Sequence, residues 1–140
     1  KALHKSFLAS VKEKGKMELF RSNNPDFKDG EQLRDFIYVK DVVEVLYFIM
    51  NKKSDSAIYN LGTAKARSFY DLASAVFNSE NKKINISFVD TPEDIRNNYQ
   101  YYTKANMKKL RSIGCQKEFT SLERGIEDYV KNYLTDGVYY

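Results

Sequence analysis

The sequence has 140 residues, of which 42% are hydrophobic and 30% charged, so it can build one packed domain but is too polar for a membrane protein. Its longest apolar runs, such as VVEVLYFIM, fall well short of the ~20 residues that a membrane-spanning helix needs. The net charge of +4 comes from lysines in short scattered groups, and no helix carries a continuous basic stripe. We therefore expect one domain, over residues 1–140, that binds neither nucleic acid nor membrane.

The start of the chain and its cysteine content indicate where the protein works. The single cysteine, Cys115, has no partner for an internal disulfide, which is typical of a reducing cytoplasm. No charged stretch followed by an apolar one opens the chain, so no signal peptide is apparent. Instead, KALHKSFLASVKEKGK has the apolar spacing of a helix already under way, which should end near Gly15. We expect a cytoplasmic protein whose sequence here starts inside a longer chain.

The pattern after this helix predicts a strand, a loop, a second strand and a helix. MELF (17–20) is a short strand candidate, and the turn residues of RSNNPDFKDGEQ (21–32) predict a loop. RDFIYV (34–39) has the aromatic and β-branched content of a strand. Asp41 is placed to cap a helix that runs to about Asn51, with apolar residues on one face.

The middle of the chain predicts strand, helix and strand again. AIYNLG (57–62) has the composition of a strand that stops at its glycine. Ser68, followed three residues later by Asp71, resembles a capping box for the helix FYDLASAVFNS (69–79). INISFVD (84–90) alternates between apolar and polar residues, which indicates a strand.

Three threonines are predicted to begin the remaining helices. Thr91 precedes Pro92, a combination that favours a short helical turn. Thr103 is placed to start a helix that ends at Gly114, and Thr120 to start the last helix. The whole pattern is one of helices interleaved with short strands, so we predict the α/β class.

The residues alone predict no complete catalytic centre. His4 is the only histidine, and no group of histidines and carboxylates has the spacing of metal ligands. The six glycines are isolated, so no G-x-G-x-x-G or phosphate-binding glycine loop is present. We therefore expect no catalytic residue, no cofactor-binding loop and no metal site in this chain.

Arg34 is the best candidate for a ligand contact. It lies between a loop rich in backbone N–H groups and a predicted strand, where a guanidinium can bind a pyrophosphate with two hydrogen bonds. From the residues alone, an ion pair with Asp35, Glu31 or Asp41 is the more frequent outcome for such an arginine. Tyr99 can donate its hydroxyl to a phosphate or sugar, although it is one of 11 tyrosines.

Four segments in order carry a resemblance to a known family. DGEQLRDFIYVKDVV, IYNLGTAKARSFYDLA, RNNYQYYTKANMKKLRSIG and FTSLERGIEDYV resemble the C-terminal half of the extended short-chain dehydrogenase/reductase sugar-nucleotide epimerases. LFRSNNPDFKDGEQLRDF combined with RNNYQYYTKANMKKLR is most similar to the heptose 6-epimerases of that superfamily. Those enzymes act on ADP-glycero-manno-heptose in the synthesis of lipopolysaccharide core precursors.

The resemblance implies two domains with different functions. In that family an N-terminal Rossmann domain binds NADP, and a smaller C-terminal α/β domain binds the sugar nucleotide. The cofactor glycines and the catalytic Tyr-x-x-x-Lys lie upstream of the part that this chain matches. The expected chain is thus a small substrate-binding α/β domain without the Rossmann domain, and it should be inactive by itself. The complete enzyme would invert C6 by transient oxidation and form a homo-oligomer.

The resemblance also implies a set of substrate contacts, transferred position by position. The set is His4, Phe20, Arg21, Ser22, Asn23, Arg34 and Tyr99, with Arg34 as the phosphate-binding arginine. The loop before Arg34 allows a rival register, in which residues 27–30 replace 20–23. Two alternatives stay open: the C-terminal domain of a UDP- or dTDP-hexose 4-epimerase or dehydratase, and a non-catalytic ligand-binding module.

Overall fold

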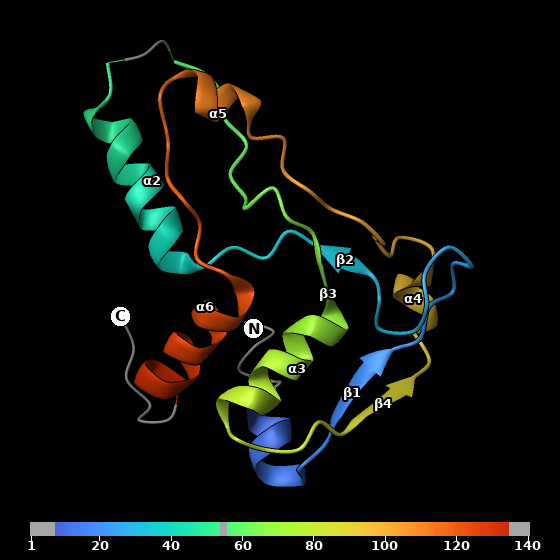
Figure 1. The fold of residues 1–140 in the computed structure, drawn as a ribbon. Helices are drawn as coiled ribbons and strands as arrows, with labels where there is room; N and C mark the ends of the chain where they lie inside the picture. Colours follow the sequence, from blue (N-terminus) through green and yellow to red (C-terminus); the bar gives the residue numbers. More distant parts are fainter. Residues whose placement is uncertain (1–7, 54–55, 135–140) are drawn as a thin grey trace.

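The computed structural model describes residues 8–53 and 56–134, and Figure 1 shows how their helices and short strands are arranged. In chain order the elements are η1 (Ser10–Lys14), β1 (Met17–Phe20), β2 (Leu33–Arg34), α2 (Val39–Asn51), β3 (Arg67–Ser68), α3 (Phe69–Ser79), β4 (Ile86–Val89), α4 (Glu93–Arg96), α5 (Lys108–Ser112), α6 (Leu122–Tyr129) and η2 (Val130–Leu134). The mixed content of helix and strand confirms the α/β class. In the part of the chain that is described, no helix is long and apolar enough to span a bilayer.

The strands form two separate pairs. β1 and β4 run parallel, with Met17 opposite Ile86 and Phe20 opposite Val89. β2 and β3 run antiparallel, with Leu33 opposite Ser68, and an isolated bridge also joins Leu33 to Tyr102. Leu33 therefore lies between two segments that are far apart in the sequence.

The larger apolar core lies between α3, β1 and the last helices. Phe77 and Val76 of α3 are fully buried there, together with Val11 and Val130. The start of α3 is fixed by the predicted capping box, in which Asp71 N donates to Ser68 Oγ at 2.9 Å and Ser68 N donates to Asp71 Oδ2 at 3.1 Å. The predicted helix over 69–79 is confirmed at both ends.

A smaller apolar cluster lies between α2 and α5, away from the β1–β4 pair in Figure 1. Val45 is buried there, but other apolar residues of α2 face outward, and Met50 is 82% exposed. Leu46, which the pattern placed on the buried face with Val45, is half exposed. The amphipathic pattern predicted the helix correctly, whereas little of its apolar surface is buried among the described residues.

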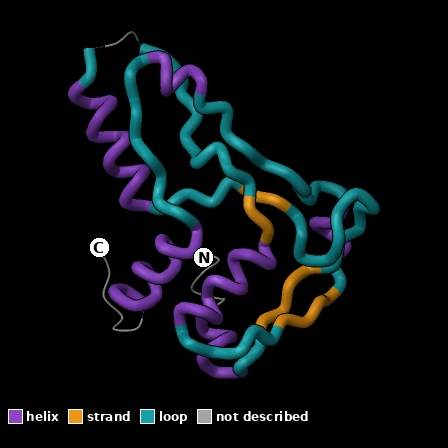
Figure 2. The backbone as a smooth tube through the Cα atoms, viewed as in Figure 1, coloured by secondary structure: helices purple, strands orange, loops and turns teal. Residues whose placement is uncertain are grey.

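Two predicted strands are wrong. Only Arg34 of RDFIYV belongs to a strand, since residues 35–38 lie outside any strand and α2 already begins at Val39. AIYNLG (57–62) is also a connecting segment without a ladder, drawn as loop in Figure 2. Aromatic and β-branched residues favour a strand only where a neighbouring strand supplies hydrogen bonds and packing. Among the described residues, neither segment forms a ladder with a neighbouring strand, and residues 101–105 run beside 33–35 only through an isolated bridge at Leu33 and the bond from Asp35 N to Thr103 Oγ1.

Two of the predicted helix caps bind each other instead. Asp41 lies in the first turn of α2, where the cap position belongs to Tyr38. Its buried carboxylate accepts hydrogen bonds from Thr120 N at 2.7 Å and from Thr120 Oγ1 at 3.0 Å. The cap of α6 is therefore Ser121, whose hydroxyl accepts from Arg124 N.

The other two threonines also serve the tertiary structure. Pro92 holds the cap position of α4, while Thr91 Oγ1 donates to the carbonyl of Arg21 at 2.9 Å. α5 starts at Lys108, five residues after the predicted start at Thr103. Gly15 does end the first helical segment in the left-handed region, with φ of 62°, as predicted.

Candidate functional site

The guanidinium of Arg34 is held at the edge of β2 by backbone oxygens and aromatic rings. Its Nη1 donates to the carbonyl of Leu33 at 2.8 Å, and its Nη2 donates to the carbonyl of Gln100. Its Cζ lies 5.6 Å from the ring centre of Phe69 and 5.7 Å from that of Tyr99. These contacts fix the orientation of the group while leaving its charge unneutralised.

The ion-pair interpretation of Arg34 is wrong for the described residues. Within 8–53 and 56–134, no carboxylate lies at ion-pair distance from its guanidinium. Asp41 pairs with Lys117 at 3.0 Å, and Asp35 accepts its hydrogen bonds from other segments. A partly exposed guanidinium that has no acidic partner among the described residues is suited to bind an anionic ligand.

An aromatic group borders Arg34. The ring of Tyr99 meets Phe20 edge-on at 6.3 Å and Tyr101 at 5.2 Å, and Tyr101 meets Phe27 at 5.6 Å. The structure therefore brings three of the predicted site residues together, namely Phe20, Tyr99 and Arg34. Burial raises the pKa of Tyr99, and the positive charge of Arg34 offsets part of that rise. The hydroxyl therefore stays protonated at neutral pH and can donate a hydrogen bond.

The loop after β1 is folded back on itself. Arg21 lies 3.8 Å from Asp29 and 3.5 Å from Asp90, and Ser22 N donates to Asp29 Oδ1 at 2.8 Å. Asn23 N donates to the hydroxyl of Tyr101 at 3.1 Å, which joins this loop to the aromatic group.

Both registers of this loop therefore lie at the same place, because residues 20–23 and 27–30 contact each other or the same tyrosine. Each stays a prediction. His4, the remaining predicted contact, lies outside the described residues.

Sequence reasoning missed three neighbours of Arg34. Phe69, Gln100 and Tyr101 each contact Arg34 or the aromatic group around it. A signal for Tyr101 was present, because alternate residues of an extended segment share a face, and Tyr99 and Tyr101 are two apart. Phe69 carried no such signal, since only the β2–β3 pairing places the start of α3 beside Arg34.

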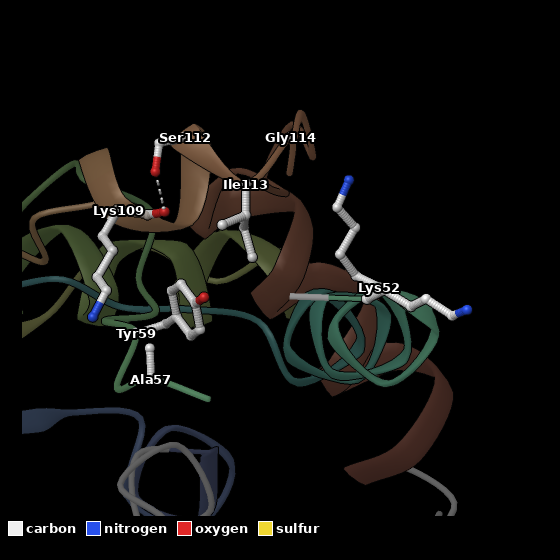
Figure 3. Close-up of a pocket in the computed structure, with 8 residues that line it drawn as sticks. Lys52, Ala57, Tyr59, Lys109, Ser112, Ile113 and Gly114 are labelled. Carbon is white, nitrogen blue, oxygen red and sulfur yellow. Dashed lines mark hydrogen bonds between the residues drawn. The ribbon is translucent and has the colours of Figure 1, made fainter. Parts of the chain in front are cut away.

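A separate hollow of about 610 Å³ lies between the end of α2 and α5 (Figure 3). Lys52, Lys53 and Lys109 line it with Tyr59, and Lys109 Nζ lies 5.2 Å from the ring centre of Tyr59. None of the predicted site residues that the structure describes lines this hollow. Lysines at the C-terminal ends of helices offset the partial negative charge of free carbonyls, so their presence there needs no ligand.

The described residues hold no cluster of metal ligands, and the sequence has no glycine-rich loop for a dinucleotide. Within the described ranges, no three side chains of His, Cys, Asp or Glu come close enough to hold a metal ion. The isolated glycines form no loop that would fit the pyrophosphate of a dinucleotide at the start of a helix.

Solved structures with the same arrangement define the class of fold. UDP-N-acetylglucosamine 4-epimerase from Methanobrevibacter ruminantium superposes with a TM-score of 0.76 at 18% identity, over 96% of this chain and 40% of that one. ADP-L-glycero-D-manno-heptose-6-epimerase from Helicobacter pylori superposes with a TM-score of 0.73 at 23% identity, over 92% of this chain and 36% of that one. The chain thus has the fold of part of an extended short-chain dehydrogenase/reductase epimerase, as predicted.

Sequence comparison narrows this class. Residues 3–62 match the model of the NAD dependent epimerase/dehydratase family. The chain is 47% identical over 145 residues to ADP-L-glycero-D-manno-heptose-6-epimerase of Fusobacterium nucleatum subsp. nucleatum, covering 94% of this chain and 44% of that protein. It is 46% identical to the enzyme of the same name from Nitratidesulfovibrio vulgaris strain DP4, over 90% of this chain and 39% of that one. The resemblance to the heptose 6-epimerases is confirmed, and the chain spans less than half the length of these curated relatives.

Proposed function

We propose that this chain supplies the sugar-nucleotide-binding part of an epimerase that inverts C6 of ADP-glycero-manno-heptose. Identities of 46–47% to proteins named for that activity, over at least 90% of this chain, support the assignment. The complete protein would be a cytoplasmic homo-oligomer that serves the synthesis of lipopolysaccharide core precursors.

The observation that carries the proposal is the unneutralised guanidinium of Arg34. A diphosphate brought to this edge would meet a charge that no described carboxylate satisfies. A guanidinium binds phosphate oxygens through parallel N–H groups, and such charge-assisted bonds are about twice as strong as neutral ones. Tyr99 provides a neutral hydroxyl donor on the same side, since its ring lies 5.7 Å from the guanidinium.

We propose the remaining substrate contacts from the resemblance, and the surroundings of Arg34 support part of them. Phe20 lies against Tyr99, and Arg21, Ser22 and Asn23 continue from it into the loop that reaches Tyr101. We assign this loop to the nucleotide, with residues 27–30 as the rival register. His4 completes the set as a substrate contact by resemblance alone.

The oxidation and reduction steps would be carried out by residues other than the substrate contacts of this chain. The nicotinamide cofactor, which we propose to be NADP, would take up and return the hydride. Because the chain offers no glycine-rich loop for a dinucleotide, the cofactor-binding and catalytic residues would lie in another part of the complete protein. This chain would bind the remote nucleotide and so hold the sugar in place for a reaction elsewhere.

The test is a comparison of nucleotide binding by the complete protein. Calorimetry with ADP, UDP and dTDP should show a preference for ADP. Arg34→Ala should weaken ADP binding by about 1–3 kcal/mol, the range for a hydrogen bond to a charged group. NADP content should stay unchanged.

The matched control is Arg111→Ala. Arg111 also donates to a backbone carbonyl, that of Cys115 at 2.7 Å, and lies over an aromatic ring, that of Phe119, but at α5. It should leave ADP affinity unchanged. A preference for UDP or dTDP would instead favour a hexose 4-epimerase or dehydratase, and equal ADP affinity of wild type and Arg34→Ala would contradict the role of Arg34.

A further inference from the structure

Asp35, the neighbour of Arg34, joins three separate segments through its carboxylate. Oδ1 accepts from Thr63 N at 2.7 Å and from Thr63 Oγ1 at 2.5 Å. Oδ2 accepts from Ala64 N at 3.0 Å and from Ala105 N at 2.9 Å. One carboxylate thus satisfies three backbone N–H groups in connecting segments that have no sheet ladder of their own.

The fit around this carboxylate is close. A Cβ atom at Gly62 would lie 2.5 Å from Asp35 Oδ2 and 2.6 Å from the Cβ of Ala105. Only a residue without a side chain therefore lets the chain turn past Asp35 at this point. This explains the glycine of YNLGT by close approach, whereas the sequence suggested only the end of a strand.

The segment that Asp35 holds is the one that carries the partners of Arg34. Leu33 N donates to Tyr101 O at 2.8 Å, and Thr103 N donates to Leu33 O at 3.1 Å. Asp35 N donates to Thr103 Oγ1 at 3.4 Å, and the carboxylate then binds Ala105. Residues 101–105 are thus fastened along 33–35, directly after Tyr99 and Gln100, which contact the guanidinium.

The carboxyl group of Asp35 must be ionised to accept these four hydrogen bonds. Burial raises the pKa of Asp35, but the hydrogen bonds from Thr63, Ala105 and Ala64 together outweigh it and hold the pKa below its ordinary value. An ionised carboxylate is an acceptor at both oxygens, whereas an amide would turn its NH₂ toward donors. Asn is therefore nearly the same shape but cannot accept all four bonds.

We propose that Asp35 is a positioning residue for the ligand site, acting through the segment 99–105 to hold Tyr99 and Gln100 against Arg34. The inference rests on the proposed function, because it assigns Arg34 to the nucleotide diphosphate. A purely structural role would make Asp35 matter for stability alone. Asp41 provides the comparison, since it is a second carboxylate that holds a distant segment but contacts no partner of Arg34.

The experiment is a double-mutant cycle on ADP affinity in the complete protein, measured by calorimetry well below every variant's melting temperature. We expect Asp35→Asn to weaken ADP binding on the order of tenfold in the wild-type background, and to have almost no further effect in Arg34→Ala. The matched control Asp41→Asn should lower the melting temperature while leaving ADP affinity unchanged. Thr63→Val, which removes only the hydroxyl donor, should give a smaller loss of affinity and serves if Asp35→Asn does not fold.

Three results would overturn the inference. If folded Asp35→Asn binds ADP as tightly as the wild type does, Asp35 is a structural residue only. If Asp35→Asn does not fold, the same conclusion follows from wild-type ADP affinity in folded Thr63→Val. Equal losses of affinity in Asp35→Asn and Asp41→Asn would show a general effect of destabilisation. The third result is additivity. If the losses of ADP binding free energy in Asp35→Asn and Arg34→Ala add up in the double mutant, Asp35 does not act through Arg34. Failure of the proposed function can be distinguished from failure of this inference about Asp35. If the proposed role of Arg34 is wrong, Arg34→Ala itself binds ADP as the wild type does.

Discussion

The region around α3 and the region around α2 are stabilised in different ways. α3 buries five residues along its length and packs against β1 and α6, so apolar contacts hold it. α2 is longer but buries only Asp41 and Val45, and several of its apolar side chains face outward. It is connected to the rest of the chain both by the smaller apolar cluster, through Val45, Phe48 and Ile49, and by Asp41, which binds Thr120 and Lys117.

This difference shows that amphipathic helices of similar pattern can combine apolar burial and polar contacts in different proportions. Apolar burial is non-directional and scales with area, so α3 is secured by many small contributions. A buried carboxylate is directional and fixes one segment against another through a few bonds. The proposed ligand site lies where the two regions meet, since Arg34 contacts Phe69 at the start of α3 and precedes α2.

The largest expected effect comes from the apolar region. Phe77→Ala removes a fully buried ring and should lower the free energy of unfolding by about 3–5 kcal/mol. Met50→Ala, on the exposed face of α2, should change it by less than about 0.5 kcal/mol. Urea unfolding followed by circular dichroism measures both, and equal losses would contradict the comparison.

A smaller effect on stability is expected from Asp41 of α2, which binds Thr120 and Lys117. Asp41→Asn weakens the pair with Lys117 and leaves one Thr120 donor without a good acceptor, which should cost about 2–3 kcal/mol of unfolding free energy. Glu44→Gln is the matched control, because Glu44 also pairs with Lys117, at 2.7 Å, but is exposed. It should cost less than about 1 kcal/mol. An equal cost for both variants would show that burial of Asp41 is unimportant.

The most specific test concerns the pH dependence of Asp35. Because hydrogen bonds hold its folded-state pKa below the ordinary 3.8, the ionised form contributes stability above that pH and loses it as the pH falls through the folded-state value. The difference in unfolding free energy between wild type and Asp35→Asn should thus be about 1–3 kcal/mol at neutral pH. This difference should shrink as the pH falls below about 4, toward and through the folded-state pKa of Asp35.

Urea titrations of both proteins from pH 7 to pH 3 measure this difference in unfolding free energy. The contributions of the other carboxylates are the same in both proteins and cancel in the difference. A difference that stays constant across the range would mean that the charge of Asp35 does not contribute.

Local sequence signals located most of the helices and one pair of strands correctly. α3 was predicted to the residue because its capping box and its apolar spacing agree. β1 and β4 also lie where the pattern placed them. The errors in the helix caps fall on residues whose polar groups have long-range partners, such as Asp41 and Thr120, which bind each other across 79 positions. The two wrong strands, RDFIYV and AIYNLG, have the composition of strands but no neighbouring strand to form a ladder.

The candidate site shows the same limit. The sequence singled out Arg34, Tyr99 and Phe20, and the structure brings them together. It could not distinguish an ion pair from an unneutralised guanidinium, because Asp35 is adjacent in sequence yet directs its carboxylate to Thr63, Ala64 and Ala105.

By itself, the sequence determined the α/β class, the helix boundaries with strong caps, and the family resemblance through RDF, YNLG and NNYQ. These features depend on local backbone preference or on short motifs, which a single chain displays directly. The tertiary structure alone decided which aspartate holds which segment, why Gly62 has no side chain, and that Arg34 carries its charge without an acidic partner in the described chain. Hydrogen bonds and close approach depend on distances in space, and residues far apart in sequence set those distances.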